Sequence, residues 1–241
     1  MITLRRSRIV FAFFAVLGCA ALVGSGLWIP VYYGIMGKRT VNDVILSMGE
    51  GARARMRPYY ERAGVSYPPT AVAFVALKDE RRLEVYADRG GAWIFVRSYE
   101  ILKASGGAGP KLKEGDLQVP EGIYAIEGLN PNSAYHLSMK IDYPNEFDLA
   151  MAQREQRTDL GGDIFIHGKA ASIGCLAMGD EAIEELFTLA HDVRIEHIRV
   201  VIAPQDFRAE RAISTTNAPD WVNDLYVTLR NELTLYQRPI D

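Results

Sequence analysis

The sequence predicts a mainly β domain with a few helices, an α+β fold, whose antiparallel strands form a sandwich- or barrel-like sheet behind one N-terminal transmembrane or signal segment. Three observations predict this fold. A long apolar run follows an arginine-rich head at the N-terminus. Short β-branched and aromatic runs, separated by turn residues, recur between Ala71 and Ala203. Helical periodicity is confined to a few segments before, between and after these runs.

Residues 1–37 are the predicted membrane anchor or signal segment. The apolar run at residues 9–29 has the length of about 20 residues that a membrane-spanning helix needs. The basic head before it contains Arg5, Arg6 and Arg8. Because basic flanks stay in the cytoplasm, we expect the rest of the chain to lie outside it. Cleavage near residues 24–26 is the alternative to an uncleaved anchor.

Two helical segments flank the predicted domain, which covers residues 67–207. Residues 38–66 form a connector whose apolar stripe contains Val41, Val44, Ile45 and Met48. The sequence Gly-Glu-Gly at residues 49–51 is predicted to break this connector. Residues 208–241 form a C-terminal extension that is expected to pack on the sheet through Trp221, Val222, Leu225, Leu229 and Leu233.

Strands inside the domain are predicted from residue type and turn chemistry. The runs at residues 71–77, 83–86 and 93–96 should form two or three antiparallel strands, because charged or glycine-rich turns separate them. A short helix is expected at residues 146–154. The later predicted strands lie at residues 123–126, 135–141, 164–166 and 197–203.

Composition excludes several classes of function. The net charge of -3 gives no overall basic signature, so no nucleic-acid partner is expected. The two cysteines, Cys19 and Cys175, lie in very different surroundings and do not predict a disulfide framework. The glycine-rich loop at residues 105–111 lacks the P-loop ending, which excludes a nucleotide site. No histidine, cysteine and carboxylate grouping has zinc-ligand spacing, so neither a metal nor a cofactor is expected.

His167 and Cys175 are the candidate base and nucleophile. The apolar run at residues 164–166 ends at His167, which should place the imidazole at a strand end. Cys175 precedes an amphipathic helix with Asp180 as its N-cap, and the helix dipole would favour a thiolate. Gly174 would let the backbone approach a reacting carbonyl and its oxyanion. The alternative is a buried cysteine and a structural histidine without chemistry.

Two segments together carry a family resemblance. Ile-His-Gly at residues 166–168 and Ser-Ile-Gly-Cys-Leu-Ala-Met at residues 172–178 resemble the active-site motif of the L,D-transpeptidase (YkuD-type) catalytic domain family, and most closely its YafK-like branch. The similarity covers residues 67–207 and implies that family's β-rich fold. Most members carry a second histidine before Gly-Cys, where this chain has Ile173 and a shorter loop.

The resemblance implies roles for individual residues. Cys175 would be the acylated nucleophile, His167 its base, and the Gly168 carbonyl the group that orients the imidazole. Ser172 and Gly174 would line the loop beside the thiol, where main-chain amides stabilise the oxyanion. Four weaker substrate-contact candidates are Lys111, Tyr143, Asn145 and His136, for which solvation, turn formation or core packing is the alternative.

The resemblance also implies a substrate. The expected reaction is attack on the diaminopimelate amide of peptidoglycan stem peptides, in the hydrolytic direction that releases covalently attached envelope protein. A true transpeptidase that forms cross-links or attaches proteins is one alternative. A membrane-anchored peptidoglycan-binding protein without catalysis is the other. The expected location is the cell envelope, either anchored in the inner membrane with the catalytic domain in the periplasm or secreted to the periplasm.

Overall fold

A computed structural model describes residues 37–172, 174–209, 212–213, 215 and 218–237. Most of the predicted membrane anchor or signal segment therefore lies outside the described residues. Within the described ranges, no helix combines the length and the apolar character that crossing a membrane requires. The elements below belong to one compact unit, Val41–Asp241.

The described strands form one sheet in the order β3-β2-β1-β9-β5-β6-β7-β8-β4. It is an open half-barrel rather than a closed barrel or a two-sheet sandwich. Neighbouring strands are antiparallel except β1 with β9 and β7 with β8. The strands are β1 (Val72–Leu77), β2 (Arg82–Arg89), β3 (Ala92–Glu100), β4 (Lys103–Ala104), β5 (Gly122–Asn130), β6 (Ser138–Ile141), β7 (Phe165–His167), β8 (Leu176–Ala177) and β9 (Ile198–Ala203). The predicted mainly β, mainly antiparallel class is confirmed.

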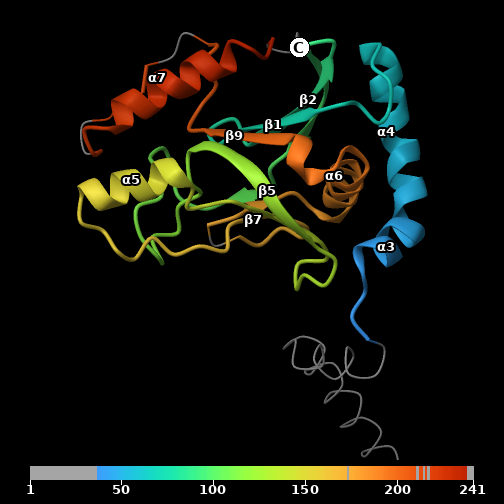
Figure 1. Ribbon diagram of the computed structural model, residues 1–241, viewed down its shortest axis with the longest axis horizontal. Helices are drawn as coiled ribbons and strands as arrows, with labels where there is room; N and C mark the ends of the chain where they lie inside the picture. The colour runs from blue at the N-terminus through green and yellow to red at the C-terminus, as the bar shows by residue number, and fades with distance from the viewer. Residues whose placement is uncertain (1–36, 173, 210–211, 214, 216–217, 238–241) are drawn as a thin grey trace, which may run out of the picture. The chain divides into compact units, whose positions relative to one another are not determined.

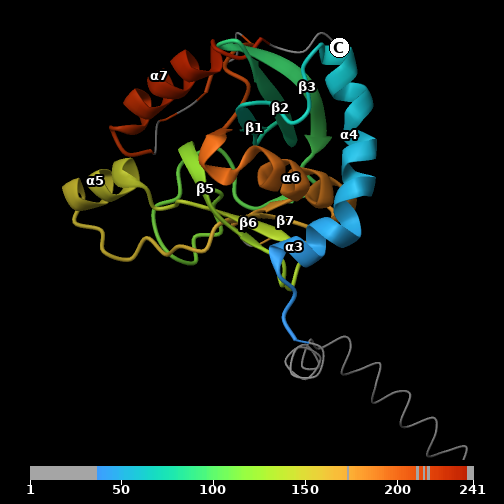
Figure 2. The ribbon, with the colours of Figure 1, turned by 45° about the vertical axis from the view of Figure 1, so that its right-hand side comes forward.

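Helices cover both faces of the central strands (Figures 1 and 2). They are α3 (Val41–Val44), η1 (Ile45–Gly49), α4 (Glu50–Ala63), α5 (Glu146–Arg154), α6 (Asp180–Val193), η2 (Ile195–His197) and α7 (Val222–Leu233). Alternate residues of β1 enter two cores because side chains on a strand alternate between faces. Val72, Phe74 and Ala76 pack with α4 and α6, whereas Ala73, Val75 and Leu77 pack with α7.

The predicted break at residues 49–51 is wrong. The chain remains helical there, because η1 is a π-helical turn that continues directly into α4. Partly buried ion pairs then hold α4 against α6. Arg55 donates to Glu185 at 2.8 Å, and Arg53 donates to Asp192 at 2.7 Å. Because the Glu185 side chain is only 1% exposed, removing its partners would leave a buried charge unpaired.

The part of the sheet formed by β6, β7 and β8 has two different faces. Met139, Ile166 and Leu176 lie side by side and pack in the same core as α6. Residues two apart on a strand share a face, so the neighbouring positions point the other way. His167 therefore projects from the face opposite α6, and the candidate site lies there.

Candidate active site

The pairing of β7 with β8 brings His167 and Cys175 to the same face of the sheet. His167 lies opposite Ala177, and Ile166 lies opposite Leu176. Continuing this register by one residue places Phe165 opposite Cys175, and the Phe165 N–H does donate to Cys175 Sγ at 3.4 Å. The imidazole and the thiol are thus diagonal neighbours. With parallel strands about 4.8 Å apart and a rise of about 3.3 Å per residue, the backbones of such neighbours lie about 8 Å apart.

His167 is oriented by the carbonyl of the next residue. Its Nδ1 lies 2.6 Å from Gly168 O, so Nδ1 carries the hydrogen that this carbonyl accepts. The Nε2 lone pair is then the one available to accept a proton. The side chain is 2% exposed, and burial lowers the pKa of His167 despite the opposing effect of the Gly168 carbonyl. A neutral imidazole can act as a base at and below neutral pH.

Cys175 is held as a thiol rather than as a thiolate. Burial raises its pKa, and the Phe165 N–H and the charge of Lys111 only partly oppose this effect. The prediction that a helix N-terminus stabilises a Cys175 thiolate is wrong, because Cys175 does not lie at the start of a helix. Cys175 leads into β8, α6 begins only at Asp180, and the N-cap position is Gly179. Both pKa shifts favour the neutral forms of these two groups, the thiol and the imidazole.

Two serine hydroxyls contact the backbone at Cys175. The Cys175 N–H donates to Ser172 Oγ at 2.9 Å, and the Ser172 hydroxyl donates to the Cys175 carbonyl at 2.5 Å. The Gly174 N–H donates to Ser105 Oγ, also at 2.5 Å. Both amides expected to serve an oxyanion are thus already engaged. Ser105 was not predicted as a site residue, because only the pairing of β4 with β8 brings it to Cys175.

Tyr135 was also missed. Its ring stacks on the His167 imidazole with the centroids 4.5 Å apart, and it is itself 38% exposed. Lys169 donates its Nζ to the Ala134 carbonyl at 2.8 Å, which ties the Tyr135 loop to the segment after β7. Tyr135 therefore lies over the His167 imidazole and contributes to its burial. Its position in a loop, far from the motif in sequence, gave no signal.

The weaker predicted contacts fall in different places. Lys111 is 7% exposed and donates to Asp116 at 2.7 Å, so its ammonium is not presented to solvent. His136 contacts Glu184 on α6 at 2.9 Å and lies before β6 rather than on a strand. Tyr143 and Asn145 line a groove beside the site, where Asn145 also caps α5.

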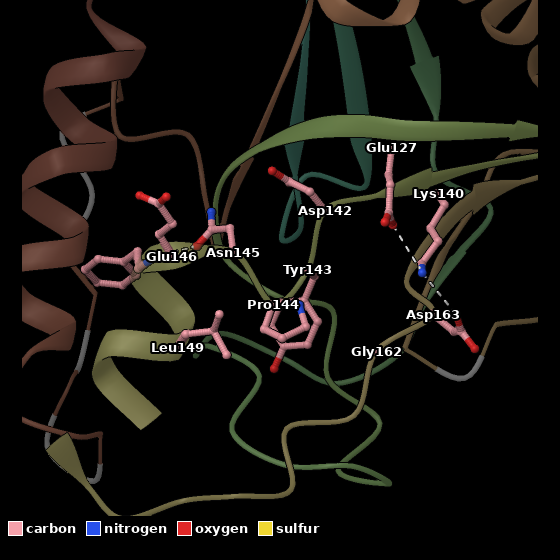
Figure 3. Close-up of a pocket in the computed structure, with 11 residues that line it drawn as sticks. Glu127, Lys140, Asp142, Tyr143, Pro144, Asn145, Glu146, Leu149, Gly162 and Asp163 are labelled. Atoms are coloured by element: carbon pink, nitrogen blue, oxygen red, sulfur yellow. Dashed lines mark hydrogen bonds and ion pairs between the residues drawn. The ribbon is translucent and has the colours of Figure 1, made fainter. Parts of the chain in front are cut away.

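This groove has a volume of about 830 Å³. Neither Cys175 nor His167 lines it, and its link to them is Asp163, a lining residue whose carbonyl lies 3.8 Å from the Cys175 thiol. Figure 3 shows Lys140 between Glu127 and Asp163. The Lys140 ammonium lies 3.1 Å from Glu127 and 3.4 Å from Asp163. The hydrogen bond to Glu127 is the main reason that the pKa of Lys140 is raised. The groove thus presents both signs of charge, and the backbone of one of its lining residues, Asp163, contacts the thiol.

Among the described residues, no group of three or more histidine, cysteine and carboxylate side chains is placed to hold a metal ion. The sequence model of the L,D-transpeptidase catalytic domain (YkuD) matches residues 70–202, more than half of the chain. The chain belongs to the L,D-transpeptidase catalytic domain family.

Within this family, the chain is similar to YafK of Escherichia coli strain K12, which is named as a provisional L,D-transpeptidase. The two are 39% identical over 112 residues, which cover 46% of this chain and 43% of YafK. The YafK of E. coli O157:H7 matches equally well. The matched region therefore spans less than half the length of these curated relatives.

Solved structures of more distant proteins are also similar. The helical cell shape determining protein Pgp2 of Campylobacter jejuni is 22% identical, with a TM-score of 0.47 over 63% of this chain and 56% of Pgp2. Bd1075 of Bdellovibrio bacteriovorus is 18% identical, with a TM-score of 0.42 over 70% of this chain and 56% of Bd1075.

Removing the Tyr135 ring from this L,D-transpeptidase-family domain should change the titration of His167. In Tyr135→Ala the imidazole gains solvent, so its pKa rises towards the ordinary value. A base must be unprotonated to act, and the acid limb of any rate that depends on His167 therefore moves to higher pH. NMR titration of the imidazole measures the shift directly. Tyr135→Phe keeps the ring and should titrate as the wild type does; an unshifted Tyr135→Ala contradicts the shielding role.

Proposed function

We propose that this domain cleaves the amide at the diaminopimelate residue of peptidoglycan stem peptides, with Cys175 as nucleophile and His167 as base, and that it hydrolyses the link to attached protein. The observation that carries the proposal is the projection of both groups from one sheet face. A groove with charges of both signs is linked to the thiol through its lining residue Asp163. Family membership and similarity to YafK support the same reaction class. The missing second histidine, replaced by Ile173, is compatible with hydrolysis.

The residues have defined roles in this reaction. His167 Nε2 accepts the thiol proton while Sγ forms a bond to the amide carbonyl carbon, and the carbonyl electron pair moves onto oxygen. The carbonyl then re-forms, the C–N bond breaks, and the imidazolium gives its proton to the leaving amine. The remaining thioester is attacked by water with His167 again as base. A free carboxylate on diaminopimelate and the Cys175 thiol result.

We further propose how the chain is organised around this reaction. Residues 67–207 are the catalytic domain, residues 38–66 connect it to the anchor or signal segment at residues 1–37, and residues 208–241 pack on it. The packing of α7 and the ion pairs of α4 support these divisions. The location is the periplasmic side of the cell envelope, because the substrate polymer lies outside the inner membrane.

Mass spectrometry of peptidoglycan that carries attached protein tests the proposal. The full chain and Cys175→Ala are incubated with it in parallel. Release of protein with a free diaminopimelate carboxylate, by the wild type alone, is the expected result. New diaminopimelate cross-links would show that the domain is a transpeptidase and not a hydrolase. Binding to peptidoglycan without any product, by the wild type and by Cys175→Ala alike, would show that the domain is a non-catalytic peptidoglycan-binding protein.

Lys140 should contribute to substrate selection. One end of diaminopimelate carries a free ammonium and a free carboxylate, which complement the carboxylates and the ammonium of the groove. Lys140→Met keeps the apolar stem but removes the charge, so kcat/KM on diaminopimelate peptides should fall by about 10-fold to 100-fold, as expected for one charged hydrogen bond. Acylation of Cys175 by p-nitrophenyl acetate should not change. Arg154→Met, which removes an exposed ion pair to Asp220, is the control and should keep both rates.

A further inference from the structure

Ser105 lies directly opposite the candidate nucleophile. In the antiparallel pair of β4 and β8, Lys103 faces Ala177 and Ala104 faces Leu176. Continuing this register by one residue places Ser105 opposite Cys175. Residues that face each other in an antiparallel pair point to the same side, with Cβ atoms about 4.5–5.5 Å apart. The Ser105 hydroxyl therefore shares the sheet face of the thiol and the imidazole.

The hydrogen bonds of the two serines differ in one respect. A hydroxyl can accept and donate at the same time. Ser172 does both, since it accepts the Cys175 N–H and donates to the Cys175 carbonyl. Ser105 accepts the Gly174 N–H, and no acceptor takes its own hydrogen within the hydrogen bonds of the described residues. Of these two hydroxyl hydrogens, the one on Ser105 is thus available to a bound carbonyl.

The loop behind Ser105 is held in place. Gly106 has a φ of +82°, and a Cβ there would lie 2.0 Å from Gln118 Oε1, so the loop fits closely against Gln118. The Gly107 N–H donates to the same oxygen at 3.1 Å. A hydrogen-bond donor that is already in place needs little reorganisation when the transition state forms, and this makes oxyanion stabilisation effective.

We propose that Ser105 is a catalytic oxyanion donor. As the thiol proton passes to His167 and the C–S bond forms, the substrate carbonyl oxygen gains the electron pair of the broken π bond. The Ser105 O–H donates to that oxygen while the Gly174 N–H holds the other side of the hydroxyl, so the amide acts through the serine. This inference rests on the proposed nucleophilic role of Cys175.

The test uses a substrate that needs no cell wall. Acetyl transfer from p-nitrophenyl acetate to Cys175 of the full chain forms the same type of oxyanion as attack on an amide. It releases p-nitrophenolate, which is measured, and Cys175→Ala gives the background rate. Alkylation of Cys175 by iodoacetamide passes through no oxyanion. Ser105→Ala should lower the acetylation rate by about 100-fold, the order measured for loss of one oxyanion donor. Ser105→Thr keeps a hydroxyl and should acetylate within a few-fold of the wild type.

The iodoacetamide rate should be the same in wild type, Ser105→Ala and Ser105→Thr. Unchanged or faster acetylation of Ser105→Ala would overturn the inference, and a faster rate would mean that the hydroxyl blocks the Gly174 amide. Equal losses of acetylation and alkylation would also overturn it, because Ser105 would then only place the thiol. Failure of the peptidoglycan assay with a normal Ser105 result would contradict the proposed substrate and leave the donor role standing.

Discussion

Replacing His167 with asparagine should lower the rate of Cys175 acetylation at neutral pH by about 10²-fold to 10⁴-fold, the usual contribution of a general base. Asparagine can still donate to the Gly168 carbonyl from a position near that of Nδ1, but it offers no basic nitrogen. Because burial raises the pKa of the thiol, the variant cannot use a resting thiolate at neutral pH. Its rate should recover as the pH rises towards the pKa of Cys175.

A pH series of the acetylation rate by p-nitrophenyl acetate measures this effect. The wild type should show an acid limb from His167, displaced below the ordinary histidine pKa because burial lowers that pKa. The variant should lack this limb. His197→Asn is a matched control, since the Nδ1 of His197 also contacts a backbone carbonyl, that of Val193 at 3.1 Å. A neutral-pH rate equal to that of the wild type would contradict the assignment of the base.

Adding one methyl group at Gly168 should damage both stability and catalysis. A Cβ there would lie 2.6 Å from the Tyr135 carbonyl oxygen, 2.8 Å from Asp180 Oδ1 and 3.0 Å from an Ile183 methyl group. The backbone must therefore shift, at a cost of about 1–3 kcal/mol in the free energy of unfolding. The same shift moves the carbonyl that orients His167. A displacement of about 1 Å can reduce a rate by about 100-fold.

Gly128→Ala is the control for this prediction, because an added Cβ at Gly128 meets no atom within 4 Å. Thermal unfolding and acetylation of both variants separate local crowding from a general effect of alanine. Gly168→Ala should unfold at lower temperature and acetylate more slowly, whereas Gly128→Ala should retain the wild-type acetylation rate. Wild-type behaviour of Gly168→Ala would mean that the carbonyl can orient the imidazole from a different position.

The sequence predicted the strands and helices where local chemistry determines them. Residues 146–154 were predicted as a helix, and α5 spans Glu146–Arg154 with Asn145 as its capping residue. The predicted break at residues 49–51 failed because tertiary packing outweighed the low helix propensity of glycine. In the structure, packing of Ile45 and Met56 in the core and ion pairs from Arg53 and Arg55 to α6 stabilise the continuous helix.

Only the part of the candidate site that lies in one continuous segment could be predicted from the sequence. His167, Gly168, Ser172, Gly174 and Cys175 lie within nine residues of one another, so the motif could be read directly. Ser105 and Tyr135 join them through strand pairing and a loop contact. Ser105 lies in a glycine-rich loop that shares the family resemblance, but no sequence pattern indicates that it contacts the Cys175 segment, and Tyr135 carries no such signal at all. The direction of the Cys175 pKa shift was also out of reach, since it depends on burial rather than on distance from a helix in sequence.

The position of β9 has a consequence for how the molecule forms. It lies between β1 and β5 and is the strand that joins β3-β2-β1 to β5-β6-β7-β8-β4 in the described sheet. Its residues, Ile198–Ala203, pair in parallel with Val72–Leu77, far earlier in the chain. Until β9 arrives, β1 and β5 each present an unpaired apolar edge, a state prone to aggregation. The half that contains Cys175 is therefore joined to the rest of the sheet only late in synthesis. A chain ending before residue 203 should need a chaperone to stay soluble.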